Sequence, residues 1–293
     1  CGIFSTVNQF LLGIEGYVVM LWHTGCGMVT STGYPYTSFK TTYVHNLFQN
    51  GAATISGLQE MYYERQARGE IPKDQKITFI MVTGDGGNDI GMGPTIGAAN
   101  RNNNVIILEY DNEGYMNTSN QLSYSTPLGH RTSTSNVGPG EQGKSFQHKD
   151  TAQIMAATHI PYIFTTNEAF PLDTIKKAAK AQWYANNMGT VYGKLFSACP
   201  FNWRHNDDMG TETVEAATNC NFFPLYEVEQ GITTLTYDPE EKGKKIQLSD
   251  WLGMMGKTRH ILKPENKAIY EAAEKEIARR YARLKAMHAS DIL

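Results

Sequence analysis

The stretch Val82-Thr83-Gly84-Asp85-Gly86-Gly87-Asn88-Asp89 decides the fold of this 293-residue chain. It continues an apolar, β-rich run at residues 77–82 and breaks abruptly into glycine and aspartate, as a buried strand does when it leaves a sheet. A glycine on each side of Asp85 lets the backbone turn sharply and approach a ligand closely. The stretch therefore predicts a buried strand that ends at a ligand-binding turn.

A second stretch, Asp111-Asn112-Glu113-Gly114-Tyr115-Met116-Asn117-Thr118, follows another apolar strand at residues 104–110. In a parallel strand-helix-strand unit both strand ends lie at the same edge of the sheet, where open α/β sheets bind ligands. We therefore expect Asp85 and Asn112 to be neighbours. A carboxylate, an amide oxygen and a nearby backbone carbonyl form an all-oxygen set suited to Mg²⁺, which substrate phosphates and water usually complete. The two stretches together predict a diphosphate–metal site.

The rest of the chain alternates strands with helices, which predicts an α/β fold with a mostly parallel twisted sheet and helices on both faces. Further strands are expected at residues 17–22, 162–165 and 190–198, and helices at 51–66 and 171–187. The segment from 264 to about 288 has apolar positions at helical spacing, which predicts a long amphipathic helix. We predict a cofactor domain at 1–225 and a C-terminal extension at 226–293. Its helix either docks to another subunit or packs on its own chain.

Composition excludes several classes of function. The formal net charge is −3, and no cluster of Lys and Arg suggests a nucleic-acid surface. No apolar run has the length needed to cross a bilayer, and no signal peptide is visible. We therefore expect a cytoplasmic protein that binds neither nucleic acid nor membrane.

Four cysteines, Cys1, Cys26, Cys199 and Cys220, are too few for a disulfide-stapled domain of this length. Cys26 lies in a small-residue turn after the strand at 17–22, and Cys199 ends the strand at 190–198. Iron–sulfur clusters are held by four Cys thiolates that can be far apart in sequence. Burial as small apolar side chains is the alternative for each cysteine.

The residues around Asp85 and Asn112 resemble the thiamine diphosphate motif, in which Gly-Asp-Gly is followed roughly 25 to 30 residues later by an Asn that ends a strand. With Cys1-Gly2, Thr24-Gly25-Cys26-Gly27 and Cys199-Pro200 in the same order, the chain resembles the thiamine-binding β subunits of 2-oxoacid:ferredoxin oxidoreductases. This resemblance covers about residues 1–225.

The resemblance implies three cofactors: thiamine diphosphate, Mg²⁺ and a [4Fe-4S] cluster. Asp85, Asn112 and the carbonyl of Gly114 would bind Mg²⁺. Cys1, Cys26 and Cys199 match the last three of four cluster ligands in the family, which implies a first ligand upstream of Cys1. Cys220 matches none of the four and is interpreted as structural, with a role as the fourth ligand as the alternative if nothing precedes Cys1. The residues expected at the cofactors are Gly25, Cys26, Gly27, Gly84, Asp85, Gly86, Gly87, Asn112, Asn117 and Thr118.

The resemblance also implies a role for Asn117, whose neutral amide would donate to negative charge that develops at the reacting carbon. An ordinary loop asparagine is the alternative. Partner subunits of the α and γ/δ type would supply the glutamate that activates thiamine and most substrate-binding arginines, and ferredoxin would accept the electrons. Within the polar loop at 117–149, His130, Arg131 and His148 are expected to be solvated, with a reach to a substrate carboxylate or the diphosphate as the alternative.

Gly27 after Cys26 and the neutral segment at 45–51 favour oxalate as the substrate, because they resemble the oxalate oxidoreductase β subunit more than a pyruvate enzyme. A pyruvate:ferredoxin oxidoreductase β subunit is the alternative within the family. A non-oxidative thiamine diphosphate decarboxylase or carboligase would share Asp85 and Asn112 without needing the cysteines. A scaffold that binds nucleotide at the glycine-rich turn is the hypothesis from another class.

Overall fold

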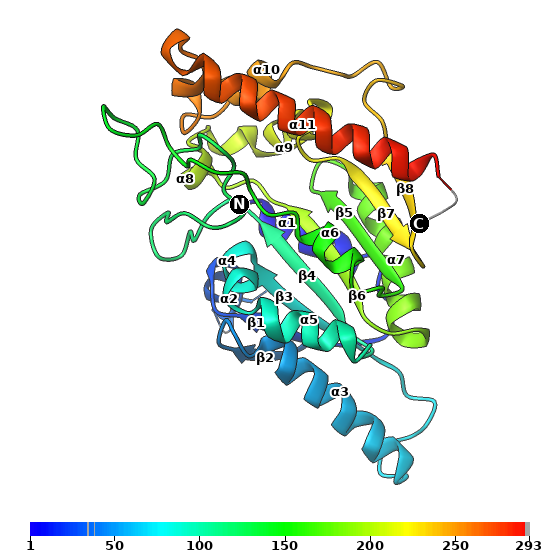
Figure 1. Cartoon of the computed structure of the whole chain (residues 1–293). Helices are drawn as coiled ribbons and strands as arrows, with labels where there is room; N and C mark the ends of the chain where they lie inside the picture. Colours follow the sequence, from blue (N-terminus) through cyan, green and yellow to red (C-terminus); the bar gives the residue numbers. More distant parts are fainter. Residues whose placement is uncertain (34, 38, 291–293) are drawn as a thin grey trace.

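The structure is a computed structural model that describes residues 1–33, 35–37 and 39–290. One eight-stranded sheet forms its centre, with the order β2-β1-β3-β4-β6-β5-β7-β8 (Figure 1). The strands are β1 Tyr17–His23, β2 Thr42–Asn46, β3 Ile77–Gly84, β4 Ile106–Asp111, β5 Tyr162–Asn167, β6 Val191–Phe196, β7 Leu225–Glu229 and β8 Ile232–Tyr237. The α-helices are α1 Gly2–Leu11, α2 Cys26–Ser31, α3 Gly51–Ala67, α4 Asp85–Ile90, α5 Met92–Asn100, α6 Thr151–Ala156, α7 Pro171–Asn187, α8 Pro200–Trp203, α9 Gly210–Asn219, α10 Leu248–Gly253 and α11 Lys267–His288.

The six strands from β2 to β5 in this order pair in parallel, which confirms the predicted mostly parallel sheet. The last two strands are antiparallel and were not predicted. They form a hairpin whose two loop residues, Gln230 and Gly231, have φ values of 49° and 89°. Such left-handed pairs match the twist of a two-residue hairpin, but Gln-Gly indicates one less strongly than Asn-Gly does.

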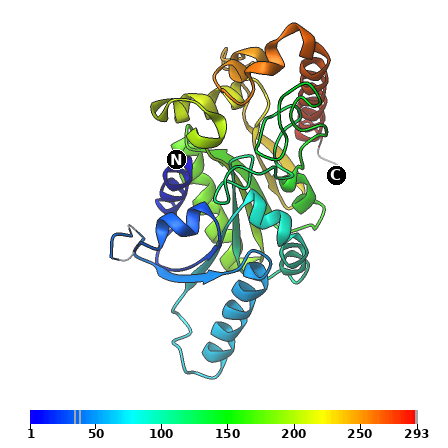
Figure 2. The ribbon, with the colours of Figure 1, turned by 90° about the vertical axis from the view of Figure 1, so that its left-hand side faces the viewer.

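Helices cover both faces of the sheet, as predicted. Alternate residues of β4 point to opposite sides: Leu108 packs in the core that includes α1 and α7, and Ile107 packs in the core that includes α3 and α5. Figure 2 shows α1 (dark blue) and α5 (cyan) on opposite sides of the sheet. All six residues of β4 are buried, since each face of this central strand is covered.

The C-terminal segment shares its packing with the rest of the chain. Strands β7 and β8 belong to the same sheet, and Leu284 of α11 packs in the core that contains Ile107 and Tyr226. The predicted long helix is present as a 3₁₀ turn, Pro264–Asn266, followed by α11, which lies beside β8 (Figure 1). The division at residue 225 and the docking role of the helix stay predictions.

In the part of the chain that the structure describes, no helix combines the length and the apolar character required for a membrane span.

Candidate active site

The turn at Asp85 is built by the end of β3 and the start of α4. Strand β3 runs on to Gly84, and α4 begins at Asp85, so the expected open turn is tighter than predicted. The parallel register places Gly84 beside Tyr110, one residue before β4 ends at Asp111. Asp85 and Asn112 therefore lie at the same edge of the sheet and line one cavity of about 210 Å³, which confirms that they are neighbours.

Close packing explains the glycines after Asp85. A Cβ atom at Gly86 would lie 2.3 Å from Cδ1 of Tyr115, and one at Gly87 would lie 2.6 Å from Oγ1 of Thr83. Both separations are too short for any side chain, so the turn fits only glycine at these positions. The sequence Gly-Asp-Gly-Gly thereby lets the backbone of α4 approach the cavity closely.

Asp85 and Asn112 present buried oxygens to the cavity. The Asp85 carboxylate is 2% exposed, and its Oδ2 accepts a hydrogen bond of 2.5 Å from Oγ of Ser123. Burial, followed by the negative charge of Asp111, holds the pKa of Asp85 well above its usual range. Oδ1 of Asn112 is buried and has no hydrogen-bond partner among the described residues. An orphaned amide oxygen beside a buried carboxylate fits a hard cation such as Mg²⁺.

Other predicted cofactor contacts lie around the same cavity. Besides Asp85 and Asn112, the cavity is lined by the predicted residues Gly25, Cys26, Gly84, Gly86, Gly87, Gly114, Asn117 and Thr118. Gly27 lies one residue further along α2, where its backbone N–H donates to the hydroxyl of Tyr110. Asn117 is exposed at the rim, which leaves its amide accessible to a bound molecule.

Three cysteines gather at this edge of the sheet. The backbone N–H of Gly2 donates to the carbonyl of Ala198 at 2.9 Å, which sets Cys1 beside Cys199. Cys26 begins α2 rather than lying in a turn. Burial raises its pKa to about 11, and the charges of Cys199 and then Asp85 add to this rise. The Cys26 thiol therefore lies close enough to interact with both Cys199 and Asp85.

Cys220 is separate from this group. It is buried in the core formed with α9 and α10, and its Sγ–H donates to the carbonyl of Ala217 at 3.4 Å. Within the described ranges no three His, Cys, Asp or Glu side chains converge on a point that would hold one metal ion. A four-iron cluster makes a different demand, because each thiolate binds its own iron atom.

Comparisons with known proteins agree with this geometry. Residues 24–190 match the family model described as the thiamine pyrophosphate enzyme, C-terminal TPP binding domain. The chain is 39% identical to pyruvate synthase subunit PorB of Thermotoga maritima over 291 residues, covering 97% of this chain and 87% of that protein. The chain belongs to the thiamine-binding β subunits of 2-oxoacid:ferredoxin oxidoreductases.

Two further relatives extend the comparison within this β-subunit family. Ketoisovalerate oxidoreductase subunit VorB of Pyrococcus furiosus is 30% identical, covering 97% of this chain and 89% of that protein. The solved structure of 2-oxoglutarate:ferredoxin oxidoreductase from Magnetococcus marinus is similar in fold, with a TM-score of 0.55 at 20% identity over 92% of this chain and 89% of that one. The names of these relatives back the pyruvate alternative better than the main prediction, oxalate.

The sequence did not predict the role of Lys149, a basic residue that contacts the turn at Asp85. Nζ of Lys149 donates to the backbone carbonyl of Asp85 at 2.9 Å and to Oδ1 of Asp89 at 2.6 Å. Oδ2 of Asp89 accepts from the hydroxyl of Tyr115 at 3.1 Å. These contacts fasten α4 to the loop that follows Asn112. Asp89 stands in the quoted stretch, but nothing in the spacing indicates that Lys149 reaches it.

A second missed group supports the loop from behind. Glu113, with a left-handed φ of 66°, forms a buried ion pair with Lys257, and its Oε2 lies 3.4 Å from Nδ1 of His130. Burial lowers the pKa of His130 to about 4. Solvation was therefore the wrong expectation for His130. It was also wrong for His148, which Arg280 contacts at 2.7 Å, and right for the exposed Arg131.

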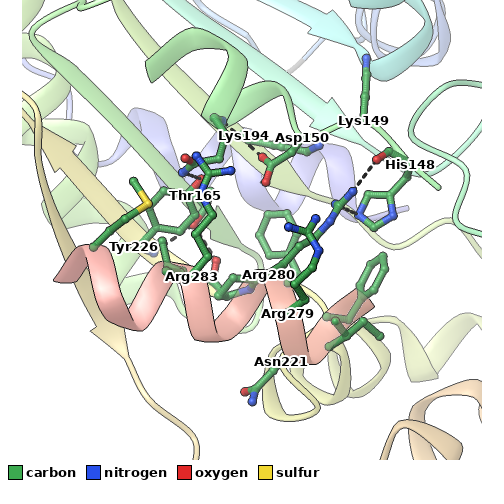
Figure 3. Close-up of a pocket in the computed structure, with 17 residues that line it drawn as sticks. His148, Lys149, Asp150, Thr165, Lys194, Asn221, Tyr226, Arg279, Arg280 and Arg283 are labelled. Carbon is green, nitrogen blue, oxygen red and sulfur yellow. Dashed lines mark hydrogen bonds between the residues drawn. The ribbon is translucent and has the colours of Figure 1, made fainter. Parts of the chain in front are cut away.

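Arg279, Arg280 and Arg283 of α11 line another cavity, of about 170 Å³. These side chains are labelled in Figure 3. Two of these guanidinium groups, those of Arg279 and Arg280, bind acceptors of the same chain. Glu276 pairs with Arg279 at 2.7 Å and with Arg280 at 2.8 Å. Arg280 also donates to the carbonyl of His148 at 2.7 Å. The contacts of Arg280 with His148 dock α11 onto the segment that leads into α6.

Proposed function

We propose that this β subunit carries thiamine diphosphate, Mg²⁺ and a [4Fe-4S] cluster in a pyruvate:ferredoxin oxidoreductase. The observation that carries this proposal is the shared cavity, in which the oxygens of Asp85 and Asn112 lie with the thiol of Cys26. The similarity to a pyruvate synthase subunit at 39% identity supports pyruvate as the 2-oxoacid.

Mg²⁺ would be held by the carboxylate of Asp85, Oδ1 of Asn112 and the carbonyl of Gly114, with the diphosphate completing the shell. Thiamine diphosphate, when bound, supplies the carbanion chemistry and the electron sink for carbon dioxide release. The chain's own part is placement. Ser123 and Lys149 orient the Asp85 segment, and Asn117 offers a neutral amide donor at the rim of the cavity.

Cys1, Cys26 and Cys199 would provide three thiolates for the cluster, with a fourth ligand outside this set. The cluster would supply one-electron acceptance beside the cofactor. Bringing Cys1 next to Cys199 through the Gly2–Ala198 hydrogen bond supports this assignment. Cys220 is too deeply packed in its own core to join them.

Partner subunits of the α and γ/δ type would complete the site, and ferredoxin would take the electrons. Ile90, which lines the cavity, is 51% exposed, and nearby Leu47 is 53% exposed, which supports a covering partner at this edge. We place the complex in the cytoplasm.

A branched 2-oxoacid is the second candidate substrate, because VorB, named for ketoisovalerate, is 30% identical over nearly the whole chain. A non-oxidative thiamine enzyme would need Asp85 and Asn112 but not Cys26.

The test is anaerobic purification of the whole complex, followed by analysis of iron, acid-labile sulfide, thiamine diphosphate and Mg²⁺. Ferredoxin reduction is then measured with pyruvate, 2-oxoisovalerate and oxalate. We expect four iron atoms assigned to this subunit and the highest kcat/KM with pyruvate. Absence of iron would overturn the redox role, and a preference for either other acid would overturn the substrate.

A further inference from the structure

Tyr110 occupies the space between the two glycine turns of the site. It lies next to the end of β4 and is 4% exposed. A Cβ atom at Gly25 would lie 3.0 Å from its hydroxyl, one at Gly27 3.0 Å from its ring and one at Gly84 3.0 Å from its ring. The turn that carries Cys26 and the turn that carries Asp85 thus pack on the same aromatic side chain.

The hydroxyl of Tyr110 is only half used. It accepts a hydrogen bond of 3.2 Å from the backbone N–H of Gly27, the residue after Cys26. Its own proton has no acceptor anywhere in residues 1–33, 35–37 and 39–290. Buried hydroxyl donors are almost always paired in proteins. Tyr110 lines the cavity together with Cys26 and Asp85, so this proton faces the place where a bound group would bring an acceptor.

We propose that Tyr110 is a positioning residue that holds the segment around Cys26 against the thiamine cavity and donates its hydroxyl proton to a sulfur atom of the cluster bound at Cys26. This inference rests on the proposed function, since it needs a cluster at Cys26. The sulfur atoms of an iron–sulfur cluster accept hydrogen bonds, and such bonds help to set its reduction potential. A donor dipole favours the more negative, reduced state.

Loss of the Tyr110 hydroxyl has two consequences for the proposed cluster at Cys26. Removing the hydroxyl takes away the proposed donor, so the cluster midpoint potential falls. The segment around Cys26 also loses the hydrogen bond between the Gly27 N–H and Tyr110 of β4. Loss of an outer contact of a metal ligand typically lowers activity about 10- to 100-fold.

The experiment compares Tyr110→Phe with Tyr43→Phe in the intact complex. Phenylalanine at 110 keeps the ring that packs under Gly27 and Gly84 and removes only the oxygen, which is also the atom nearest Gly25. The hydroxyl of Tyr43 is the matched control, because it bonds Oγ of Ser31 at 2.7 Å, at the other end of α2. The readouts are iron content, the cluster midpoint by EPR-monitored redox titration, and thiamine diphosphate affinity.

We expect Tyr110→Phe to keep its iron, to bind thiamine diphosphate as tightly as the unaltered complex, and to shift the midpoint to more negative potential. Tyr43→Phe should keep the original midpoint. Equal midpoints for the unaltered complex and Tyr110→Phe, with iron present in both, would overturn the role of Tyr110 alone. An unaltered complex without iron would overturn the proposed function and this inference together. An equal shift in both variants would assign the effect to the packing of α2 and also overturn the proposal.

Discussion

The ammonium group of Lys257 donates a hydrogen bond to the carboxylate of Glu113, and both side chains are 1% exposed. Glu113 stands between Asn112 and Gly114, the two predicted Mg²⁺ ligands of the second stretch, and it takes a left-handed backbone conformation. A side chain from the C-terminal segment therefore supports the loop that carries the two predicted Mg²⁺ ligands. Nζ of Lys257 also lies 5.4 Å from the ring centre of Trp203, whose Nε1–H donates to the Asn112 carbonyl at 3.1 Å.

Breaking this pair should be costly for stability. Lys257→Met leaves the Glu113 carboxylate buried without its cation, and such losses cost about 3–5 kcal/mol. We expect the free energy of unfolding in urea to fall by about that amount. Lys263→Met removes a cation from an exposed pair with Glu265 and should stay within about 0.5 kcal/mol of the unaltered chain. Equal losses in the two variants would show that the buried pair has no special weight.

The hydroxyl of Ser123 should matter for metal binding. Its hydrogen bond of 2.5 Å orients the Asp85 carboxylate, so Ser123→Ala should weaken the Mg²⁺-dependent affinity for thiamine diphosphate about tenfold. Calorimetric titration of the cofactor at fixed Mg²⁺ measures this. Ser125→Ala is the matched control, since Oγ of Ser125 is buried nearby without a partner among the described residues. Unchanged affinity for Ser123→Ala would refute the orienting role.

The cysteines should separate into two classes. Cys26→Ser replaces a proposed cluster ligand, and we expect iron and acid-labile sulfide to drop in the purified complex. Cys220→Ser changes a buried thiol whose Sγ–H donates to the Ala217 carbonyl. It should keep the iron content of the unaltered complex. Retention of iron in Cys26→Ser together with its loss in Cys220→Ser would reverse the assignment.

His23 should make the fold sensitive to mild acid. Burial, and then the charge of His45, lowers its pKa from 6.5 to about 4. The unfolded chain therefore binds a proton first as the pH falls below 6.5. Stability is complete above this value, declines between pH 6.5 and 4, and loses about 3 kcal/mol in total.

Urea unfolding between pH 7 and 4 tests this prediction against His23→Gln, in which the slope over this window should shrink. The exposed His159→Gln variant is the control and should keep the slope of the unaltered chain. A slope in His23→Gln as steep as in the unaltered chain would assign the acid sensitivity to other groups.

The residues at the strand ends were predictable, and those that support them were not. Asp85 and Asn112 follow apolar strands of a parallel sheet, so the alternation of the chain alone places them at one edge. Ser123 and Lys149 reach Asp85 from the long loop, whose path no periodicity encodes. Lys257 lies 144 residues beyond its partner.

Apolar patterning and turn residues predict some elements of the fold and miss others. The helix α7 was predicted with the bounds that it has, because Pro171 starts it and its apolar face is regular. The hairpin β7–β8 was missed because β8 alternates only partly, with exposed Ile232 at its start, and its Gln230-Gly231 turn is a weak sequence pattern.

The contact between Lys257 and Glu113 also has a consequence for biosynthesis. Chains emerge from the ribosome in order, so the strands β3 and β4 can pair while Lys257 has not yet been made. Until then, the Glu113 carboxylate lacks its ammonium partner, and the loop that carries Asn112 lacks this one contact. The loop therefore gains its full set of contacts only after the segment with Lys257 has been synthesised and has folded back onto the sheet.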